Sequence, residues 1–180
     1  MKPITIVFSA TATTLAIIAF AVAAFGESVQ KAKPTFVTEI PPGYRDWKLI
    51  SVAHEEGNLN DIRAILGNDI AVKAYRQGTL PLPEGSIIAR IAWTFDESQE
   101  NNNAFAPFLK QGVQRSFVAG HPTNGVQFMV KDSKKYFATG GWGYAHFNDG
   151  KPASDTFMQS CFPCHQTIKS RDYVFAHYAP

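Results

Sequence analysis

The stretch SIIARIAWTF, residues Ser86–Phe95, carries the clearest strand pattern in the chain. Ile87, Ile91 and Phe95 fall on one face at the two-residue period of a β-strand, and Arg90 falls on the other face. Prolines and a glycine precede the stretch and polar residues follow it, as is typical of a strand between turns. We therefore predict a sheet with this strand inside it.

Weaker strand patterns lie on both sides of this stretch and are separated by glycine and asparagine. These predicted strands are Tyr44–Ala53, Val113–Ala119, Gly125–Val130 and Trp142–Phe147. The run Asn148-Asp149-Gly150 is a strong turn signal, because these residues tolerate the backbone angles of tight turns. Short turns join antiparallel neighbours, so the pattern favours a mainly antiparallel sheet.

Helical spacing of apolar residues predicts helix within Leu59–Gln77 and a short helix over Thr156–Cys164. Asn68–Asp69 is expected to cap a second helix within the first of these segments, and Gly78 is expected to end it. Glu97–Asn103 is expected to be a polar loop. Antiparallel strands with helices placed early and late indicate an α+β domain with a few helices.

The N-terminal segment has the features of an export signal. Lys2 supplies a positive charge, Ile4–Phe25 is uncharged, and Ala21-Val22-Ala23 has the small-x-small pattern of a cleavage site. We predict a signal peptide over residues 1–24, with an uncleaved membrane anchor as the alternative, and export to the periplasm. Residues 25–43 are expected to form a leader segment, and residues 44–180 the folded domain.

Charge and cysteine content narrow the function classes. The formal net charge is only +2 and no basic run is present, which argues against a nucleic-acid partner. The only two cysteines, Cys161 and Cys164, lie in one short motif near the C-terminus, so no wider disulfide framework exists. This placement indicates chemistry at the motif itself.

The motif Cys161-Phe162-Pro163-Cys164-His165 has the C-x-x-C-H pattern of c-type haem attachment. Two thiols three positions apart can add to the two vinyl groups of one haem, and the adjacent His165 can then ligate the iron. We expect one covalent haem c held by Cys161, Cys164 and His165. The alternatives are a redox disulfide, a zinc site completed by a distant residue, and purely structural cysteines.

The ligand on the other side of the iron is not fixed by the sequence. The candidate side chains are His54, His121, His146, His177, Met129 and Met158. Met158 is too near the motif to reach the opposite face, and Met129 is expected in the core. We favour an open or weakly closed distal site; the alternative is a six-coordinate electron-transfer cytochrome with no substrate chemistry.

The order of segments resembles the cytochrome P-460 family, which includes the cytochrome c′-beta proteins. The resembling residues are Tyr44–Trp47, Ile65–Ala74, Pro83–Gly85, Met129–Asp132, Gly140–Gly143, Cys161–His165 and Arg171–Phe175. The resemblance implies a mainly antiparallel β domain, a homodimer, and a five-coordinate haem with histidine on the proximal side. It also implies binding or redox conversion of hydroxylamine or nitric oxide, with a redox partner that the sequence does not identify.

The sequence departs from the family in one respect. In the P-460 members a lysine is joined to the porphyrin edge, but Ser86–Leu109 contains no lysine, and Arg90 takes the polar place on the strand. Arginine is a poor nucleophile because it stays protonated. The resemblance therefore leaves hydroxylamine oxidase activity in doubt.

Arg90 is our distal candidate. Its guanidinium is suited to hydrogen-bond an anion, a nitrogen oxide or a haem propionate, and the alternative is a plain surface arginine at a sheet edge. Arg63 is a similar but weaker candidate. Four aromatic residues are further candidates near the cofactor, with ordinary core packing as the alternative for the phenylalanines: Phe95, Phe105, Phe108 and Trp142.

Overall fold

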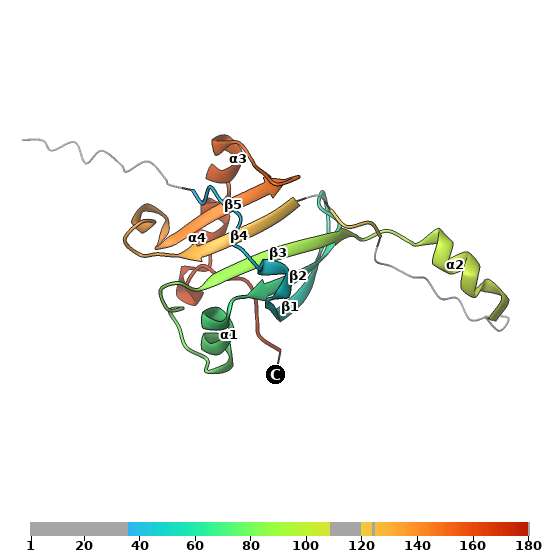
Figure 1. Ribbon diagram of the computed structural model, residues 1–180, viewed down its shortest axis with the longest axis horizontal. Coiled ribbons are helices and arrows are strands. Elements are labelled where there is room, and N and C mark those ends of the chain that lie inside the picture. Colours follow the sequence, from blue (N-terminus) through green and yellow to red (C-terminus); the bar gives the residue numbers. More distant parts are fainter. Residues whose placement is uncertain (1–35, 109–119, 124, 180) are drawn as a thin grey trace, which may run out of the picture. The chain divides into compact units, whose positions relative to one another are not determined.

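Six antiparallel strands in the described residues form one sheet, in which neighbours in sequence are neighbours in space. The protein is seen here as a computed structural model that describes residues 36–108, 120–123 and 125–179 (Figure 1). The strands are β1 Lys48–Glu55, β2 Asp61–Gly67, β3 Ile87–Thr94, β4 Gly125–Lys131, β5 Trp142–Asn148 and β6 Lys151–Pro152. This arrangement confirms the predicted α+β class with a mainly antiparallel sheet.

The strand predicted over Ser86–Phe95 is β3, which lies between β2 and β4. Alternate residues of β3 enter two different cores, because successive side chains point to opposite faces of a sheet. Ile88 packs in the core that includes Trp142 and Tyr144, whereas Ala89 packs in the core that includes Phe128 and Phe147. The alternation in the sequence therefore reports a strand that is covered on both faces.

Different segments cover the two faces of the sheet. Helix α1 (Asp69–Arg76), helix α4 (Cys161–Gln166) and the C-terminal tail pack on the face that carries Ile88. Part of the expected leader segment packs on the other face, where Val37 is buried and its N–H donates to the carbonyl of Tyr144. The face covered by α4 is the one on which the motif lies, and we call it the motif face.

The helix predicted within Leu59–Gln77 is only half present. Its first half is strand β2, which pairs with β1 and β3, and only Asp69–Arg76 is helical. The prediction was wrong for residues 61–67 because their apolar spacing suits a strand as well as a helix, and pairing with two neighbouring strands decides between them. The predicted cap at Asn68 and end at Gly78, with φ 62°, are confirmed.

The structure also bears on the segments expected before and after the central strands. Glu97–Asn103 was expected as a loop, but helix α2 (Gln99–Phe105) begins there, because the side chain of Ser98 accepts a hydrogen bond from the N–H of Asn101. The helix expected over Thr156–Cys164 is two helices, α3 (Asp155–Gln159) and α4, which meet at Ser160. The strand expected at residues 113–119 and the predicted signal segment lie outside the described residues.

The predicted turn at Asn148-Asp149-Gly150 is confirmed. Asp149 and Gly150 both have positive φ, and they join β5 to β6 as a two-residue hairpin loop. Short 3₁₀ turns lie at Tyr44–Asp46, Ala106–Phe108, Phe137–Thr139 and Lys169–Arg171. Of the helices in the described part of the chain, none has the length and apolar character needed to cross a bilayer.

Asn68 ties α1 to the start of β3. Its side-chain oxygen accepts from the N–H groups of Ala71 and Ile87, at 3.0 and 3.1 Å, and its amide donates to the carbonyl of Gly85 at 2.8 Å. One side chain thus caps the helix and fixes the loop that returns to the sheet.

We predict that Asn68→Ala lowers the free energy of unfolding by about 2–3 kcal/mol, because a cap and two further hydrogen bonds are lost. Asn68→Asp keeps the accepting oxygen and should lose about 1 kcal/mol. Ser98→Ala, which removes only the cap of α2, is the control and should cost about 1 kcal/mol or less. Denaturant unfolding of the purified protein measures all three, and equal losses for Asn68→Ala and Ser98→Ala would contradict the linking role.

Candidate functional site

Helix α4 carries both cysteines of the motif. Cys161 and Cys164 are three residues apart, and residues at this spacing are neighbours on one side of a helix. Both thiols are free, with Cys161 half-buried and Cys164 exposed. Burial raises the pKa of the Cys161 thiol. The structure therefore presents two adjacent unpaired thiols and no disulfide.

A hydrogen bond to the main chain fixes the imidazole of His165. Its Nδ1 lies 2.7 Å from the carbonyl oxygen of Tyr173. Because a carbonyl can only accept, Nδ1 carries the proton and Nε2 keeps its lone pair. Burial lowers the pKa of His165, and the bond to Tyr173 opposes this shift only in part. The neutral imidazole with a bare Nε2 is the form that ligates metals.

Aromatic rings surround His165 on the motif face. The ring centroids of Tyr144 and Phe175 lie 5.0 and 5.1 Å from the imidazole, and Phe162 contacts Tyr144 in turn. The hydroxyl of Tyr144 is buried and has no hydrogen-bond partner among the described residues. Burial also raises the pKa of this phenol, so it stays protonated. A buried donor without a partner thus lies beside the expected axial ligand.

The sheet register places Arg90 on the motif face. Ile88 pairs with Met129, which pairs with Tyr144, so these three residues form one row across β3, β4 and β5. Two positions along the strands, the next row on the same face consists of Arg90, Gln127 and His146.

Arg90 belongs to a buried charge cluster rather than to an exposed sheet edge. Its side chain is 13% exposed, and it pairs with Asp61, which is 5% exposed. Arg63 contacts the other carboxylate oxygen of Asp61 at 2.7 Å and also pairs with Glu55. We call Glu55, Asp61, Arg63 and Arg90 the arginine cluster. The plain surface arginine considered above is therefore wrong for Arg90.

Arg90 is a buried cation with one unused donor. Burial lowers the pKa of Arg90, as does the nearby charge of Arg63, while Asp61 and Glu55 oppose both effects. The Nε atom of Arg90 is buried and finds no hydrogen-bond acceptor within the described ranges. The cluster thus holds two guanidinium groups close together, with donor capacity left over.

The structure also places the candidate ligands for the second face of the iron. His146 has both ring nitrogens engaged, by Gln127 and Asn148 at 2.9 Å each. Met129 is 9% exposed in the core, as expected, and Met158 is buried in α3. None of these three side chains offers an unengaged donor atom at the protein surface.

The remaining histidines are scattered. His54 stacks on Phe95 with a centroid distance of 3.9 Å, and His121 lies beside Thr94, whose hydroxyl accepts from the His121 N–H. In the part of the chain that the structure describes, no group of three or more histidine, cysteine or acidic side chains could hold a metal ion, so the zinc alternative gains no support.

The aromatic candidates lie in different places. Phe95 contacts His54, Phe105 is 47% exposed, and the side chain of Phe108 lies outside the described part. Trp142 is fully buried beneath the amine of Lys131, which lies 4.9 Å from the ring centroid. The rings found against His165 are those of Tyr144 and Phe175, so the closeness of Phe95, Phe105 and Trp142 to the cofactor stays a prediction.

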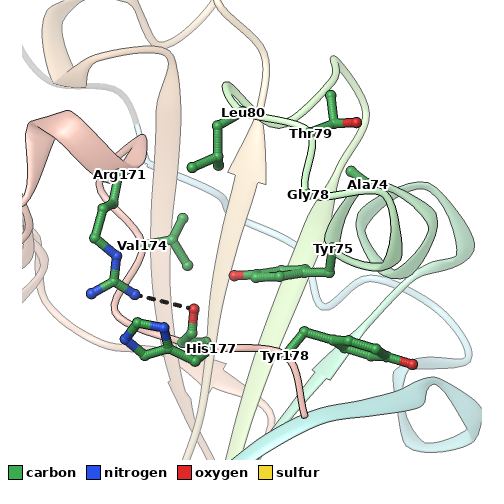
Figure 2. Close-up of a pocket in the computed structure, with 10 residues that line it drawn as sticks. Ala74, Tyr75, Gly78, Thr79, Leu80, Arg171, Val174, His177 and Tyr178 are labelled. Carbon is green, nitrogen blue, oxygen red and sulfur yellow. Dashed lines mark hydrogen bonds between the residues drawn. The ribbon is translucent and has the colours of Figure 1, made fainter. Parts of the chain in front are cut away.

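A cavity of about 250 Å³ lies between the end of α1 and the C-terminal tail. Figure 2 shows Tyr75, Arg171, Val174 and His177 around it, with the guanidinium of Arg171 bonded to a tail carbonyl. His165 and the two cysteines are not among its lining residues. His177 therefore lies at this cavity.

Sequence reasoning missed several residues that shape the site. Tyr144 has no motif of its own and is found only through the sheet register. Asp172 and Tyr173 lie in the tail segment Arg171–Phe175, which resembles the family. Only the structure shows that the Tyr173 carbonyl contacts His165. Asp61 was not singled out, since a single acidic residue at a strand end carries no signal.

The donor set suits a covalently attached haem. Two free thiols on one helical turn, a neighbouring imidazole with bare Nε2, and the buried unpartnered hydroxyl of Tyr144 lie on one face. The two thiols and the imidazole are the groups that thioether attachment and axial ligation need, and the Tyr144 hydroxyl is a buried donor left beside them. The residues present therefore fit the group that the motif predicts.

Comparison with known proteins points the same way. The chain matches the family model for cytochrome P-460 over residues 41–176, a range that contains the whole sheet, the motif and Tyr173. A search of curated proteins finds no match. Because the family match spans most of the sequence, the chain belongs to the cytochrome P-460 family, and membership implies a haem cofactor.

Proposed function

We propose that this chain is an exported c-type haem protein that binds or redox-converts small nitrogen oxides such as nitric oxide or hydroxylamine. One haem is joined to Cys161 and Cys164, and His165 is its proximal ligand. The distal site is open or weakly closed. The observation that carries the proposal is the neutral imidazole of His165, fixed by Tyr173, next to two free thiols on the same helix.

The proximal side is built to keep one geometry. The carbonyl of Tyr173 holds His165 in one tautomer, and the rings of Tyr144 and Phe175 limit its rotation. A hydrogen bond at Nδ1 makes Nε2 a stronger donor to a metal. The haem iron, when bound, supplies the site for ligand binding and electron exchange.

The distal side lacks an evident protein ligand in the described residues. His146 is engaged at both nitrogens and Met129 is in the core, so neither is available without rearrangement. This favours an open site over the six-coordinate alternative. The absence of lysine from Ser86–Leu109 argues against a porphyrin cross-link, and with it against efficient hydroxylamine oxidation.

Arg90 is the proposed distal donor. It extends from β3 on the motif face, it is largely buried, and its Nε is unused. A buried guanidinium can donate charge-assisted hydrogen bonds to a small anion or nitrogen oxide. Asp61 holds the guanidinium in place and also accepts its hydrogen bonds. The net free energy of ligand binding is therefore the gain from the new bond to Arg90 minus the loss from the Arg90–Asp61 pair.

Export and dimerisation remain parts of the proposal. Export is supported by the charge pattern of the first 24 residues, and by the thiol chemistry of haem attachment that the C-x-x-C-H motif predicts. A homodimer follows from the family resemblance. Strand β1 ends the sheet and exposes Leu49 and Val52, which is compatible with contact to a second copy.

We predict that the mature wild-type protein carries one haem that acid–acetone does not extract, visible as added mass on the intact chain. The double variant Cys161→Ser, Cys164→Ser should lose all covalent haem, because no other thiol exists in the sequence. Ser160→Ala alters a hydroxyl next to the motif and should keep the full mass. A wild-type mass without haem would overturn the proposal.

The absorption spectrum separates the open site from the electron carrier. We expect a high-spin ferrous spectrum that changes on adding carbon monoxide or nitric oxide, because no protein ligand closes the second face. We also expect no far-red Soret band, since the cross-linking lysine is absent. A sharp low-spin spectrum that neither gas alters would instead favour the six-coordinate electron carrier.

We predict that Arg90→Leu weakens nitrite binding by about tenfold or more, the effect of losing a charged hydrogen bond of about 1.5–3 kcal/mol. Carbon monoxide is neutral and a weak acceptor, so its affinity should change far less. Arg45→Leu, which removes an exposed arginine lying over Tyr44, is the matched control. Equal losses for nitrite and carbon monoxide would show that Arg90 acts on the pocket's shape and not as an anion donor.

A further inference from the structure

A buried ion pair joins the C-terminal tail to the sheet. Lys131 at the end of β4 lies 2.7 Å from Asp172, and the two side chains are 6% and 7% exposed. The second carboxylate oxygen of Asp172 accepts from the N–H of Leu82 at 2.9 Å. Asp172 therefore binds a strand and a loop that are distant in sequence from the tail and from each other.

Asp172 and the residue after it adopt costly backbone angles. Asp172 has φ 52° and Tyr173 has φ 64°, both in the left-handed region. Asp visits this region with modest strain, but an aromatic residue such as Tyr does so rarely. Residues held in such conformations persist only where the surroundings over-determine them, and they cluster at functional sites.

The strained turn aims one carbonyl at His165. Asp172 N–H donates to the carbonyl of Lys169, and Tyr173 N–H donates to that of Ile168, which closes the chain tightly after α4. The carbonyl of Tyr173 then accepts from Nδ1 of His165. This carbonyl belongs to Tyr173, and the residue just before it, Asp172, is held by its ion pair with Lys131.

The side chain of Tyr173 is also held in place, because its ring packs closely against Gly140. A Cβ added at Gly140 would lie 2.3 Å from this ring, so the ring occupies space that only a glycine leaves open. Val174 follows in the core at 5% exposure. The turn is thus held on three sides, by the ion pair, by the glycine and by the core.

We propose that Lys131 and Asp172 are positioning residues for the axial histidine: their buried ion pair holds the 172–173 turn, and through the Tyr173 carbonyl it sets the strength of the Nδ1 hydrogen bond of His165. The inference rests on the proposed haem ligation by His165. The pair is neutral overall, so its influence on the ligand comes from the position of the carbonyl and not from net charge.

The consequence concerns the donor strength of Nε2. A short Nδ1–H···O=C bond gives the imidazole more anionic character and makes Nε2 more basic. A turn that relaxes toward ordinary backbone angles would move the carbonyl and weaken this bond. The ion pair therefore stabilises the oxidised form of a ligated iron relative to the reduced form.

The primary variant is Asp172→Asn in the haem-loaded, full-length protein. Asn tolerates the left-handed region and can still accept from Leu82, but it leaves the charge of Lys131 unpaired. We expect the ferrous iron–histidine stretching band to move to lower frequency and the reduction potential to rise. Lys131→Arg in the otherwise wild-type protein keeps a cation opposite Asp172 and should leave both values at those of the wild type.

Two further variants separate positioning from general destabilisation. Leu66→Ala removes a side chain from the core on the opposite face, and it should lower the unfolding temperature without moving the iron–histidine band. Lys131→Gln breaks the same pair from the strand side while keeping the Asp172 carboxylate. If Asp172→Asn does not fold, Lys131→Gln takes its place as the test variant. We expect the same shift of the iron–histidine band.

The outcomes are distinct. The positioning role is supported if the band shifts in Asp172→Asn or Lys131→Gln and keeps its wild-type position in Lys131→Arg and Leu66→Ala. Unchanged band and potential in the ion-pair variants, with haem attached, overturn this inference and leave the proposed function standing. A wild-type protein that carries no haem contradicts the proposed function, and this inference falls with it.

Discussion

The hydrogen bond from His165 to the carbonyl of Tyr173 is the constraint on which the rest of the site depends. It decides the tautomer of the imidazole, and therefore which nitrogen can reach a metal. A side-chain partner would itself be free to rotate, whereas a main-chain carbonyl moves only with its turn. The tail after α4 is consequently part of the site, although it lies beyond the attachment motif.

Among the described residues, two groups of buried charges lie on the motif face, and they differ in how completely their donors and acceptors are paired. Lys131 and Asp172 form a closed pair, with Leu82 completing the carboxylate, and such a pair fixes geometry. The arginine cluster is open: Asp61 pairs with both guanidiniums and Glu55 pairs with Arg63, yet Arg90 Nε has no partner among the described residues. A fully paired ion pair can hold the turn beside the proposed axial ligand in one position. A cluster with an unused donor can bind a further ligand.

The sequence was sufficient for features that depend on local pattern and insufficient for those that depend on pairing. β3 could be predicted because its alternation and its bounding turns agree. The helix expected over residues 61–67 failed because Ile62, Ile65 and Leu66 satisfy both periods, and only β1 and β3 decide between them. The motif alone predicts His165 as the iron ligand, whereas Asp172 bonds to residues 41 and 90 positions away, a connection that no local spacing reveals.

At the proposed distal site, Arg90 has different chemistry from the lysine that the family resemblance leads us to look for on this strand. A lysine amine that loses its proton becomes a nucleophile, whereas a guanidinium keeps its proton and can only donate. Asp61 strengthens this difference, since its carboxylate favours the charged form and draws on the same donors. The consequence is a strand that offers reversible hydrogen bonds in place of a covalent link. A reversible donor would let a bound anion enter and leave, which agrees with the proposed exchange of small ligands at an unmodified cofactor.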